Sequence, residues 1–442
     1  MLLTGCNLSP LLFALFLNDL GLILNSSGLG IDLENVNIAS LFFADDVVII
    51  AMSEEALGVL MNKCTLFFKH HRLEISTKKS KVFAAHSGQV TFHGDNGSDI
   101  ELEAVCSYKY LGIPLNAGPR CFFKDFNENV QKKAEQYVAS VMSLTRSGPD
   151  RCALAYTLWN TCAMPSILYG SAIMPLSTKT LEVLEKCNNM VGRFILQVGR
   201  SSANASSFID AGLKPVWSIV AENVLLYARS VMTKSISYWP KLAMNYNLRE
   251  GLSMPYTKHL VGWMNKGNST VTTPDLIKKN IKRAAIRYVR EEQIRTRVTS
   301  FALTMPCGTK VQRWFQPKSW VSDSGFSKIL AEHRCCNAGY GNRGPAKDGC
   351  FYKLCPLCFK QGVVALNNEV HVIIECPCLE AYRSAVMLGD FIRGHRALRR
   401  RVSSVTLYSL FLSDYCPDKM QEKALCLYSM KVAWHSLMGI PL

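Results

Sequence analysis

The chain has 442 residues, 48% of them hydrophobic, and carries a formal net charge of +16 at pH 7. This size predicts about two to four domains with apolar cores, and no apolar stretch is long and uncharged enough to span a bilayer. The basic charge favours a polyanionic partner, for which nucleic acid is the first candidate and an anionic membrane surface is the alternative.

The first predicted element is an apolar helix near the start of the sequence. Ser9 followed by Pro10 is a good N-cap and first-turn pair for this helix. The apolar run lacks a preceding basic segment and contains Asn18 and Asp19. We therefore do not expect it to be a secretory signal.

Two adjacent aspartates, Asp45 and Asp46, lie between two apolar runs, residues 41–44 and 47–50. The runs are rich in β-branched and aromatic residues, so they predict two strands of a hairpin whose tight turn carries the acids. Carboxylates held side by side against apolar walls favour a bound cation. Because Asp is also a common turn residue, an ordinary polar hairpin tip is the alternative.

Three further segments follow the hairpin. A second helix is predicted to start at Ser53-Glu54-Glu55, with apolar residues at helical spacing as far as Phe68. Residues 73–81 contain several lysines, among them Lys79. Next comes the short sequence Tyr110-Leu111-Gly112.

The order of these segments resembles the palm of reverse transcriptases. Gly5 to Phe13 resembles the family's motif B, and Phe43 to Asp46 resembles the motif C box. Lys79 resembles the motif D lysine, and Tyr110-Leu111-Gly112 resembles the motif E primer grip. Four matches in order within about a hundred residues are specific, whereas any one alone is weak. By this resemblance, the residues expected to contact nucleic acid in the palm are Gly5, Ser9, Pro10, Tyr110, Leu111 and Gly112.

The resemblance implies phosphoryl transfer with two Mg²⁺ ions, which activate the 3′-hydroxyl and stabilise the leaving pyrophosphate. The implied catalytic residues are Asp45 as a direct magnesium ligand, Asp46 as a less direct one, and Lys79. Lys79 would neutralise or protonate the departing phosphate, although a lysine in such a basic segment is also expected to be merely solvated. Thr4 departs from the family, where glutamine is usual, so nucleotide discrimination is not carried over.

One part of the family's site has no match. The first metal-binding aspartate of the family lies in motif A, upstream of motif B, and the fingers that clamp the triphosphate also lie upstream. Asp125, Asp150 and Asp210 fall in other predicted modules. We therefore expect a C-terminal portion of a polymerase with half of a metal site. It should be inactive alone, and another chain could supply the fingers and motif A.

Helices are predicted downstream of residue 115. One runs from Phe126 to Leu144, and another runs from Asp150 to Ala163, with an interruption at Met164-Pro165. The apolar stripe between residues 181 and 195 is a core face by default. Four short sequences resemble the thumb and connection of non-LTR retrotransposon (LINE-type) reverse transcriptases, which would grip the template–primer duplex: Leu168-Tyr169-Gly170, Leu181-Glu182, Arg193-Phe194-Ile195-Leu196 and Gly212-Leu213-Lys214-Pro215.

A basic helix is predicted to begin at Thr273-Pro274-Asp275. Four cations recur in it at intervals of three or four residues and fall on one face: Lys279, Arg283, Arg287 and Arg290. This basic stripe either follows a phosphate backbone or is an ordinary solvated helix face. A second basic cluster near the C-terminus comprises Arg393, His395, Arg396, Arg399, Arg400 and Arg401.

Near the C-terminus, four residues have the spacing C-x2-C-x12-H-x4-C: Cys355, Cys358, His371 and Cys376. Such ligands close a tetrahedral Zn²⁺ site, so we predict structural zinc; free cysteines are the alternative. Competing ligands are Cys335, Cys336, Cys350 and Cys378. Residues 369–377 closely resemble the second half of the CCHC zinc knuckle that ends LINE-type reverse transcriptases, although the gap before His371 is longer than in many members. This resemblance implies a nucleic-acid-binding element.

The 17 cysteines are odd in number and spread over a long chain, which predicts reduced thiols in place of a disulfide framework. We therefore expect an intracellular protein, nuclear or cytoplasmic and not secreted.

The predicted fold class is α+β. The predicted division is a partial palm in residues 1–115, a mostly helical thumb and connection in 116–230, a basic helical linker region in 231–345, a CCHC zinc knuckle in 346–385, and a C-terminal helical tail in 386–442. The first functional hypothesis is a fragment of a LINE-type RNA-directed DNA polymerase, with an RNA template and a DNA primer or target as partners. The alternative is a non-catalytic nucleic-acid-binding protein derived from such an element.

Overall fold

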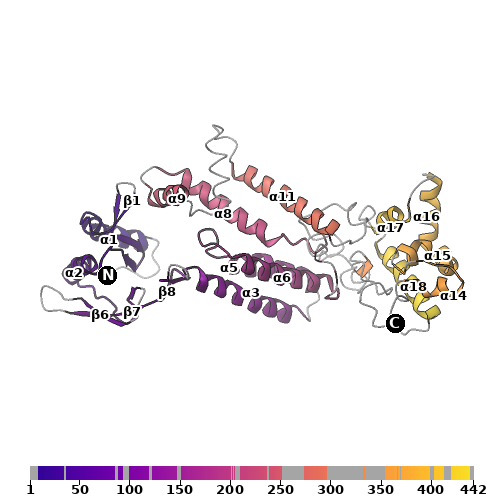
Figure 1. Ribbon diagram of the computed structural model, residues 1–442, viewed down its shortest axis with the longest axis horizontal. Helices are drawn as coiled ribbons and strands as arrows, with labels where there is room; N and C mark the ends of the chain where they lie inside the picture. Colours follow the sequence, from indigo (N-terminus) through magenta and orange to yellow (C-terminus); the bar gives the residue numbers. More distant parts are fainter. Residues whose placement is uncertain are drawn as a thin grey trace. The chain divides into compact units, whose positions relative to one another are not determined.

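The computed structural model describes residues 8–33, 36–84, 88–92, 99–118, 122–146, 151–200, 202, 204, 210–235, 238–250, 273–295, 332–333, 354–365, 367–368, 370–398, 403–412 and 420–438 (Figure 1). The fold is mixed and rich in helix, with small sheets of two or three strands, as expected for an α+β protein. It divides into two compact units. Unit 1 comprises Met1–Asn129, Ile173–Pro175 and Val224–Thr272, and unit 2 comprises Val130–Ala172, Leu176–Asn223 and Thr273–Leu442.

Unit 1 begins with helix α1 (Ser9–Asn25), which packs with α2 (Glu54–His70). The predicted hairpin is confirmed as the antiparallel pair β3 (Ser40–Phe43) and β4 (Asp46–Ile49). Its inner side chains join a core formed by residues from both helices and the start of β3: Leu20, Leu24, Ala39, Leu60 and Cys64. At the C-terminal end of α1, Asn25 Oδ1 accepts hydrogen bonds from Ala39 N at 2.8 Å and Ser40 N at 3.1 Å. The two helices therefore fix where the hairpin begins.

The two helix starts differ from each other. The prediction that Ser9 caps α1 is wrong: Ser9 is the first helical residue, and Leu8 occupies the N-cap position without a side-chain hydrogen bond. Pro10 then lies in the first turn, where its fixed φ suits the helix and its missing N–H costs nothing. By contrast, Ser53 caps α2 as predicted, and its Oγ accepts a hydrogen bond from Ala56 N at 3.2 Å.

The remaining strands of unit 1 form three small sheets. In the three-stranded sheet, β7 (Ile100–Val105) lies between β5 (Lys81–Phe83) and β6 (Gly88–Phe92). Successive side chains of β7 alternate between buried and exposed, as a half-buried strand requires. The other two sheets are the pairs β1 (Ile31–Leu33) with β2 (Val36–Ile38), and β8 (Ser107–Tyr110) with β9 (Ile113–Asn116). Helix α9 (Trp239–Arg249) packs against β1.

The β8–β9 hairpin is tied at its base to helix α3 (Lys124–Leu144). Ser107 and Asn116 face each other across the hairpin. Asp125 Oδ2 accepts a hydrogen bond from each of them, at 2.7 Å from Ser107 Oγ and 3.3 Å from Asn116 Nδ2. One carboxylate in the first turn of α3 thus holds both strands of the hairpin.

A helical bundle opens unit 2. It contains part of α3, α4 (Arg151–Leu158), α5 (Met164–Ile167), α6 (Thr178–Leu196) and the first turns of α8 (Val216–Met232). The predicted interruption lies close to a π-helical turn, Trp159–Ala163, which joins α4 to α5 just before Pro165. Such a turn is a usual way for a helix to accommodate the missing N–H of a proline. The predicted core stripe of α6 is confirmed by the burial of Leu184, Cys187, Val191 and Ile195.

A buried polar network joins α6 to the segment before α8. Asn188 accepts a hydrogen bond from Trp159 Nε1 at 2.9 Å and donates one to the carbonyl of Lys214 at 3.0 Å. Glu185 accepts a hydrogen bond from Val216 N at 2.8 Å, at the first residue of α8. These bonds hold Gly212-Leu213-Lys214-Pro215 against α6, so the sequence has a clear packing role in the bundle.

The last part of unit 2 is the C-terminal module, which we define as the described residues between 354 and 438. Its elements are α14 (Pro356–Lys360), a π-helical turn η6 (His371–Glu375), a 3-10 turn η7 (Pro377–Leu379), α15 (Glu380–Ser384), α16 (Met387–Leu398), α17 (Ser404–Leu412) and α18 (Met420–Met438) (Figure 1). Helix α18 contacts α14, η6, η7, α15 and α16, and α17 contacts η6. Leu379, Leu388, Tyr408, Phe411 and Leu427 are fully buried.

Candidate metal centre and nucleic-acid interface

The Asp45–Asp46 pair lies at the tip of the β3–β4 hairpin, whose turn falls one residue earlier than predicted. Phe43 pairs with Asp46, so Ala44 and Asp45 form a two-residue turn and Asp46 is the first residue of β4. Both aspartates are exposed, and neither carboxylate has a hydrogen bond or an ion pair within the described residues. Two unpartnered carboxylates on a rigid turn match the oxygen ligands that Mg²⁺ prefers.

The turn carries backbone strain. Ala44 has a φ of 52°, in the left-handed region that L-residues other than asparagine and aspartate rarely adopt. Strained residues persist where the surrounding structure over-determines them, and they cluster at functional sites. Here the core beneath β3 and β4 supplies that constraint.

The tip of the β8–β9 hairpin lies close to this pair. Burial raises the pKa of the Tyr110 phenol, and the nearby Asp46 carboxylate raises it further because a second negative charge there is unfavourable. Leu111 and Gly112 form the turn, with φ values of 47° and 82°. Asp46 and Tyr110 are 64 residues apart in the sequence. The structure therefore places the segment with the two aspartates near the segment Tyr110-Leu111-Gly112.

The other predicted palm residues are less closely connected. Lys79 is exposed in a turn in which Lys79 N donates to Ser76 O at 3.0 Å, and its side chain makes no hydrogen bond or ion pair among the described residues. Ser9 and Pro10 lie in the first turn of α1. Gly5 lies outside the described residues. No hydrogen bond or ion pair joins Lys79 to either aspartate in the part of the chain that is described.

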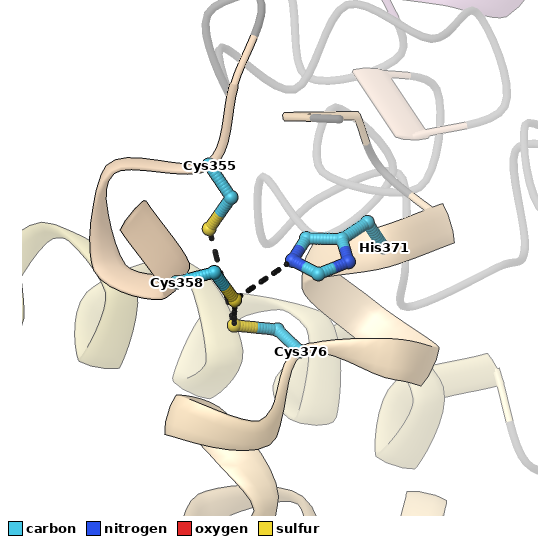
Figure 2. Close-up of side chains that lie close together, drawn as sticks. All are labelled: Cys355, Cys358, His371 and Cys376. Atoms are coloured by element: carbon cyan, nitrogen blue, oxygen red, sulfur yellow. Dashed lines mark hydrogen bonds between the residues drawn. The ribbon is translucent and has the colours of Figure 1, made fainter. Parts of the chain in front are cut away.

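Four predicted ligands come together in the C-terminal module as the Cys/His cluster, Cys355, Cys358, His371 and Cys376 (Figure 2). All four are buried, and one ligand atom from each lies within 4.8 Å of the others. Cys358 Sγ is 3.3 Å from His371 Nε2 and 3.6 Å from Cys376 Sγ, and Cys355 Sγ is 4.0 Å from Cys376 Sγ. Among the described residues this is the one group of three or more such ligands.

These distances fit a tetrahedral ion. With Zn–S bonds of about 2.3 Å, tetrahedral geometry places two sulfur ligands roughly 3.8 Å apart. The sulfur–sulfur distances of 3.6 and 4.0 Å bracket that value. Of the competing cysteines, Cys378 is partly exposed and outside the cluster, whereas Cys335, Cys336 and Cys350 lie outside the described residues. The donor set has the size and chemistry for one zinc ion.

Local backbone bonds position the four ligands. Cys355 is the N-cap of α14, its N–H donates to Ala365 O at 2.7 Å, and Cys358 follows within the helix. His371 begins the π-helical turn η6, and Cys376 N donates to His371 O at 2.6 Å to close it. Glu375 Oε2 lies 3.8 Å from His371 Nδ1, on the opposite side of the ring from Cys358. A carboxylate there favours Nε2 as the ligand atom.

The thiols also influence one another electrostatically. A hydrogen bond from Cys376 holds the pKa of the Cys355 thiol well below its usual range, against the opposing effect of burial. The same contact, followed by burial, raises the pKa of Cys376, and burial raises the pKa of Cys358 to about 11. Burial and these contacts therefore favour the protonated form of the Cys358 and Cys376 thiols. A divalent cation would displace those protons, because the thiolate is the metal ligand.

The basic stripe lies on α11 (Pro274–Arg295), which begins as predicted: Leu276 N donates to Thr273 Oγ1 at 3.3 Å. Lys279, Arg283 and Arg287 are exposed, and their side chains have no hydrogen bond or ion pair within the described part of the chain. The side chain of Arg290 lies outside that part. A different face of α11 is buried and apolar, formed by Ile277, Ile281, Ala285 and Val289.

The second basic cluster is described only in part. Arg393 is exposed and donates to Asp390 at 2.7 Å, and His395 Nδ1 lies 2.9 Å from Phe391 O. The side chain of Arg396 and residues 399–401 lie outside the described residues. Sequence reasoning had missed two polar residues near the sites, Asp125 and Arg383. The partners of Asp125 are 9 and 18 residues away, and although Arg383 pairs locally with Glu380, its bonds to the carbonyls of the cluster turn have no signal in the sequence.

Comparison with known proteins supports one part of this picture. Residues 1–115 match the family model described as reverse transcriptase (RNA-dependent DNA polymerase). This match supports a relationship of that segment to the reverse transcriptase family, whose members act on nucleic acid and generally use Mg²⁺. No curated protein matches the chain. Within the described residues, every helix is too short or too polar to be a candidate membrane span.

Proposed function

We propose that the chain is a portion of an RNA-directed DNA polymerase of the non-LTR retrotransposon type. One observation carries this proposal: the Asp45–Asp46 pair lies at the tip of a hairpin with a strained turn, within the segment that matches the reverse transcriptase family. The nearby Tyr110 supports it, because motif E of the resemblance is then close to motif C. The partners would be an RNA template and a DNA primer or target.

Each palm residue has a proposed role. Asp45 and Asp46 would hold Mg²⁺, which when bound lowers the barrier to attack by the primer 3′-hydroxyl and stabilises the pyrophosphate. Tyr110, Leu111 and Gly112 would position the primer end beside the carboxylates. Lys79 would supply positive charge to the leaving phosphate. These roles require the rigid hairpin, since metal ligands must be placed within a fraction of an ångström.

Binding of a divalent cation at the pair can be measured directly. Mn²⁺ is paramagnetic and replaces Mg²⁺ at carboxylate sites, so it should broaden the methyl resonance of Ala44 in protein labelled at alanine methyl groups. The double variant Asp45→Asn/Asp46→Asn should lose this broadening. Ala56 is the internal control, because it lies next to the exposed carboxylates Glu54 and Glu55 in the first turn of α2. Equal broadening of Ala44 and Ala56 would contradict a specific site.

We also expect the 442-residue polypeptide assayed by itself to synthesise no DNA. The described pair provides two carboxylates, and two-metal transfer depends on further ligands and on groups that bind the triphosphate. The measurement is primer extension on an RNA template with Mg²⁺. A separate polypeptide with fingers and a motif A carboxylate should restore extension if it associates. Robust synthesis by the 442 residues alone would show that this expectation is wrong.

The C-terminal module would be a zinc-stabilised nucleic-acid-binding element. Four buried ligands at tetrahedral spacing support zinc, and bound zinc would contribute to the folding free energy of the module. The proposed location is intracellular, in the nucleus or cytoplasm. The ten described cysteines, all free thiols, support a reducing compartment.

A second candidate function is a non-catalytic nucleic-acid-binding protein that descends from such a polymerase. The basic stripe favours it, because Lys279, Arg283 and Arg287 are exposed, have no partner among the described residues and are available to phosphates independently of the Asp45–Asp46 pair. The two candidates differ in one result. If the protein binds nucleic acid but Ala44 is not selectively broadened by Mn²⁺, the binding protein is the better description.

A further inference from the structure

An arginine is buried beside the Cys/His cluster. The side chain of Arg383, in α15, is only 4% exposed. Removing a guanidinium from water is costly unless its N–H groups all find acceptors. Its acceptors in this module include two backbone carbonyls and one carboxylate, so the position of Arg383 reflects a set of specific contacts.

Both carbonyls belong to the turn that carries two of the four cluster residues. Arg383 Nε donates to Ile373 O at 2.8 Å, and Nη2 donates to Cys376 O at 2.7 Å. Ile373 lies in η6, which begins at His371, and Cys376 follows it directly. The third contact joins Nη1 to Glu380 Oε2 on the first residue of α15. The planar guanidinium of Arg383 thus links α15 to the backbone of Cys376 and to the turn between His371 and Cys376.

Only arginine can make this set of contacts. Its guanidinium presents several N–H groups in a fixed plane, whereas lysine presents a compact charge that cannot reach two separated carbonyls in the same way. Without the guanidinium, the buried carbonyls of Ile373 and Cys376 would lose those bonds, a loss that is costly in the interior. The positive charge also suits a site of three thiolates and one zinc, which keeps a net negative charge.

We propose that Arg383 is the positioning residue of the metal centre, holding His371 and Cys376 in the arrangement that binds zinc. This inference rests on the zinc site of the proposed function and extends it to a residue that does not touch the metal. Loss of such an outer partner typically lowers metal affinity about 10- to 100-fold. We therefore expect the affinity order wild type, then Glu380→Gln, then Arg383→Lys, then Arg383→Met.

The test measures zinc affinity of the full chain by competition with a chelator and records the visible spectrum of the Co²⁺-loaded protein. Arg393→Met is the matched control. Arg393 also pairs with an acidic residue three positions earlier, Asp390, but its side chain is 61% exposed and it bonds to no carbonyl of the cluster turn. Arg383→Lys should lower zinc affinity at least about 10-fold and change the tetrahedral Co²⁺–thiolate band, whereas Arg393→Met should change neither.

A purely structural role would give a different result. In that case Arg383→Lys would keep the zinc affinity and the Co²⁺ spectrum of the wild type, and the proposal would be overturned. A positioning role changes both. If Arg383→Met does not fold, Arg383→Lys and Glu380→Gln still give the comparison. If the wild type binds no zinc, the proposed zinc site itself fails, and this outcome is distinct from unchanged affinity in the variants.

Discussion

Replacing Cys358 by serine is expected to abolish zinc binding and to unfold the C-terminal module. Cys358 lies closest to two other ligands, His371 at 3.3 Å and Cys376 at 3.6 Å, so its loss opens the centre of the cluster. Structural zinc contributes about 10–16 kcal/mol in small zinc domains, whereas a whole domain is stable by only about 5–15 kcal/mol. Losing the metal therefore outweighs the stability expected of the remaining core.

Elemental analysis of the purified chain gives the zinc content, and limited proteolysis with mass spectrometry locates the unfolding. In the Cys358→Ser variant, new cleavage sites should appear between residues 354 and 438, including in α17 and α18, which pack on the cluster elements. Residues of unit 1 should stay protected. Cys378→Ser is the control, since this thiol lies outside the cluster. Full zinc content in Cys358→Ser, or equal loss in Cys378→Ser, would mean that the ligand set is wrong.

Removing the basic stripe should strongly weaken nucleic-acid binding. We expect the triple variant Lys279→Ala/Arg283→Ala/Arg287→Ala to bind an RNA–DNA duplex roughly 10- to 100-fold more weakly at low salt. Each cation that neutralises one phosphate adds about 0.9 to the slope of log affinity against log salt concentration, so the slope should fall by about 2 to 3. The apolar face of α11 is untouched, and alanine favours helix, so the fold should be retained.

Fluorescence anisotropy with a labelled duplex at several salt concentrations measures both quantities. The control variant removes the same number of charges from other exposed cations that already face a carboxylate: Lys124, Lys214 and Arg249. Its net charge is the same as that of the stripe variant, so long-range attraction is matched. If both variants lose affinity to the same extent, the stripe is an ordinary solvated helix face and the binding depends on total charge.

Local features were predictable from the sequence because neighbouring residues decide them. The hairpin at Asp45 follows from β-branched runs on both sides of a polar turn, and the helix start at Thr273 follows from a hydroxyl cap before a proline. The start of α1 shows the limit of this reasoning. Ser9 has the right chemistry for a cap, but the helix begins at Ser9 itself and Leu8 takes the cap position, although the residue before a proline usually avoids the helical conformation.

The Cys/His cluster shows which features of a site depend on residues that are close together in the sequence. Its spacing identified Cys355, Cys358, His371 and Cys376 because two short turns each bring a pair of ligands together. Spacing could not show that α17 and α18 pack against those turns, since helix packing depends on faces that come from distant segments. It also could not exclude Cys378, which is only two residues from a ligand but lies outside the cluster.

By itself, the sequence determined the hairpin that carries the Asp45–Asp46 pair and the four residues of the Cys/His cluster. Each of these features depends on the types of a few residues and on the short distances between them in the sequence. The tertiary structure alone decided that Tyr110 lies near Asp46 and that Arg383 bonds to the carbonyls of the cluster turn. Such contacts depend on folding, because an arginine is buried only where packing supplies the acceptors for its N–H groups.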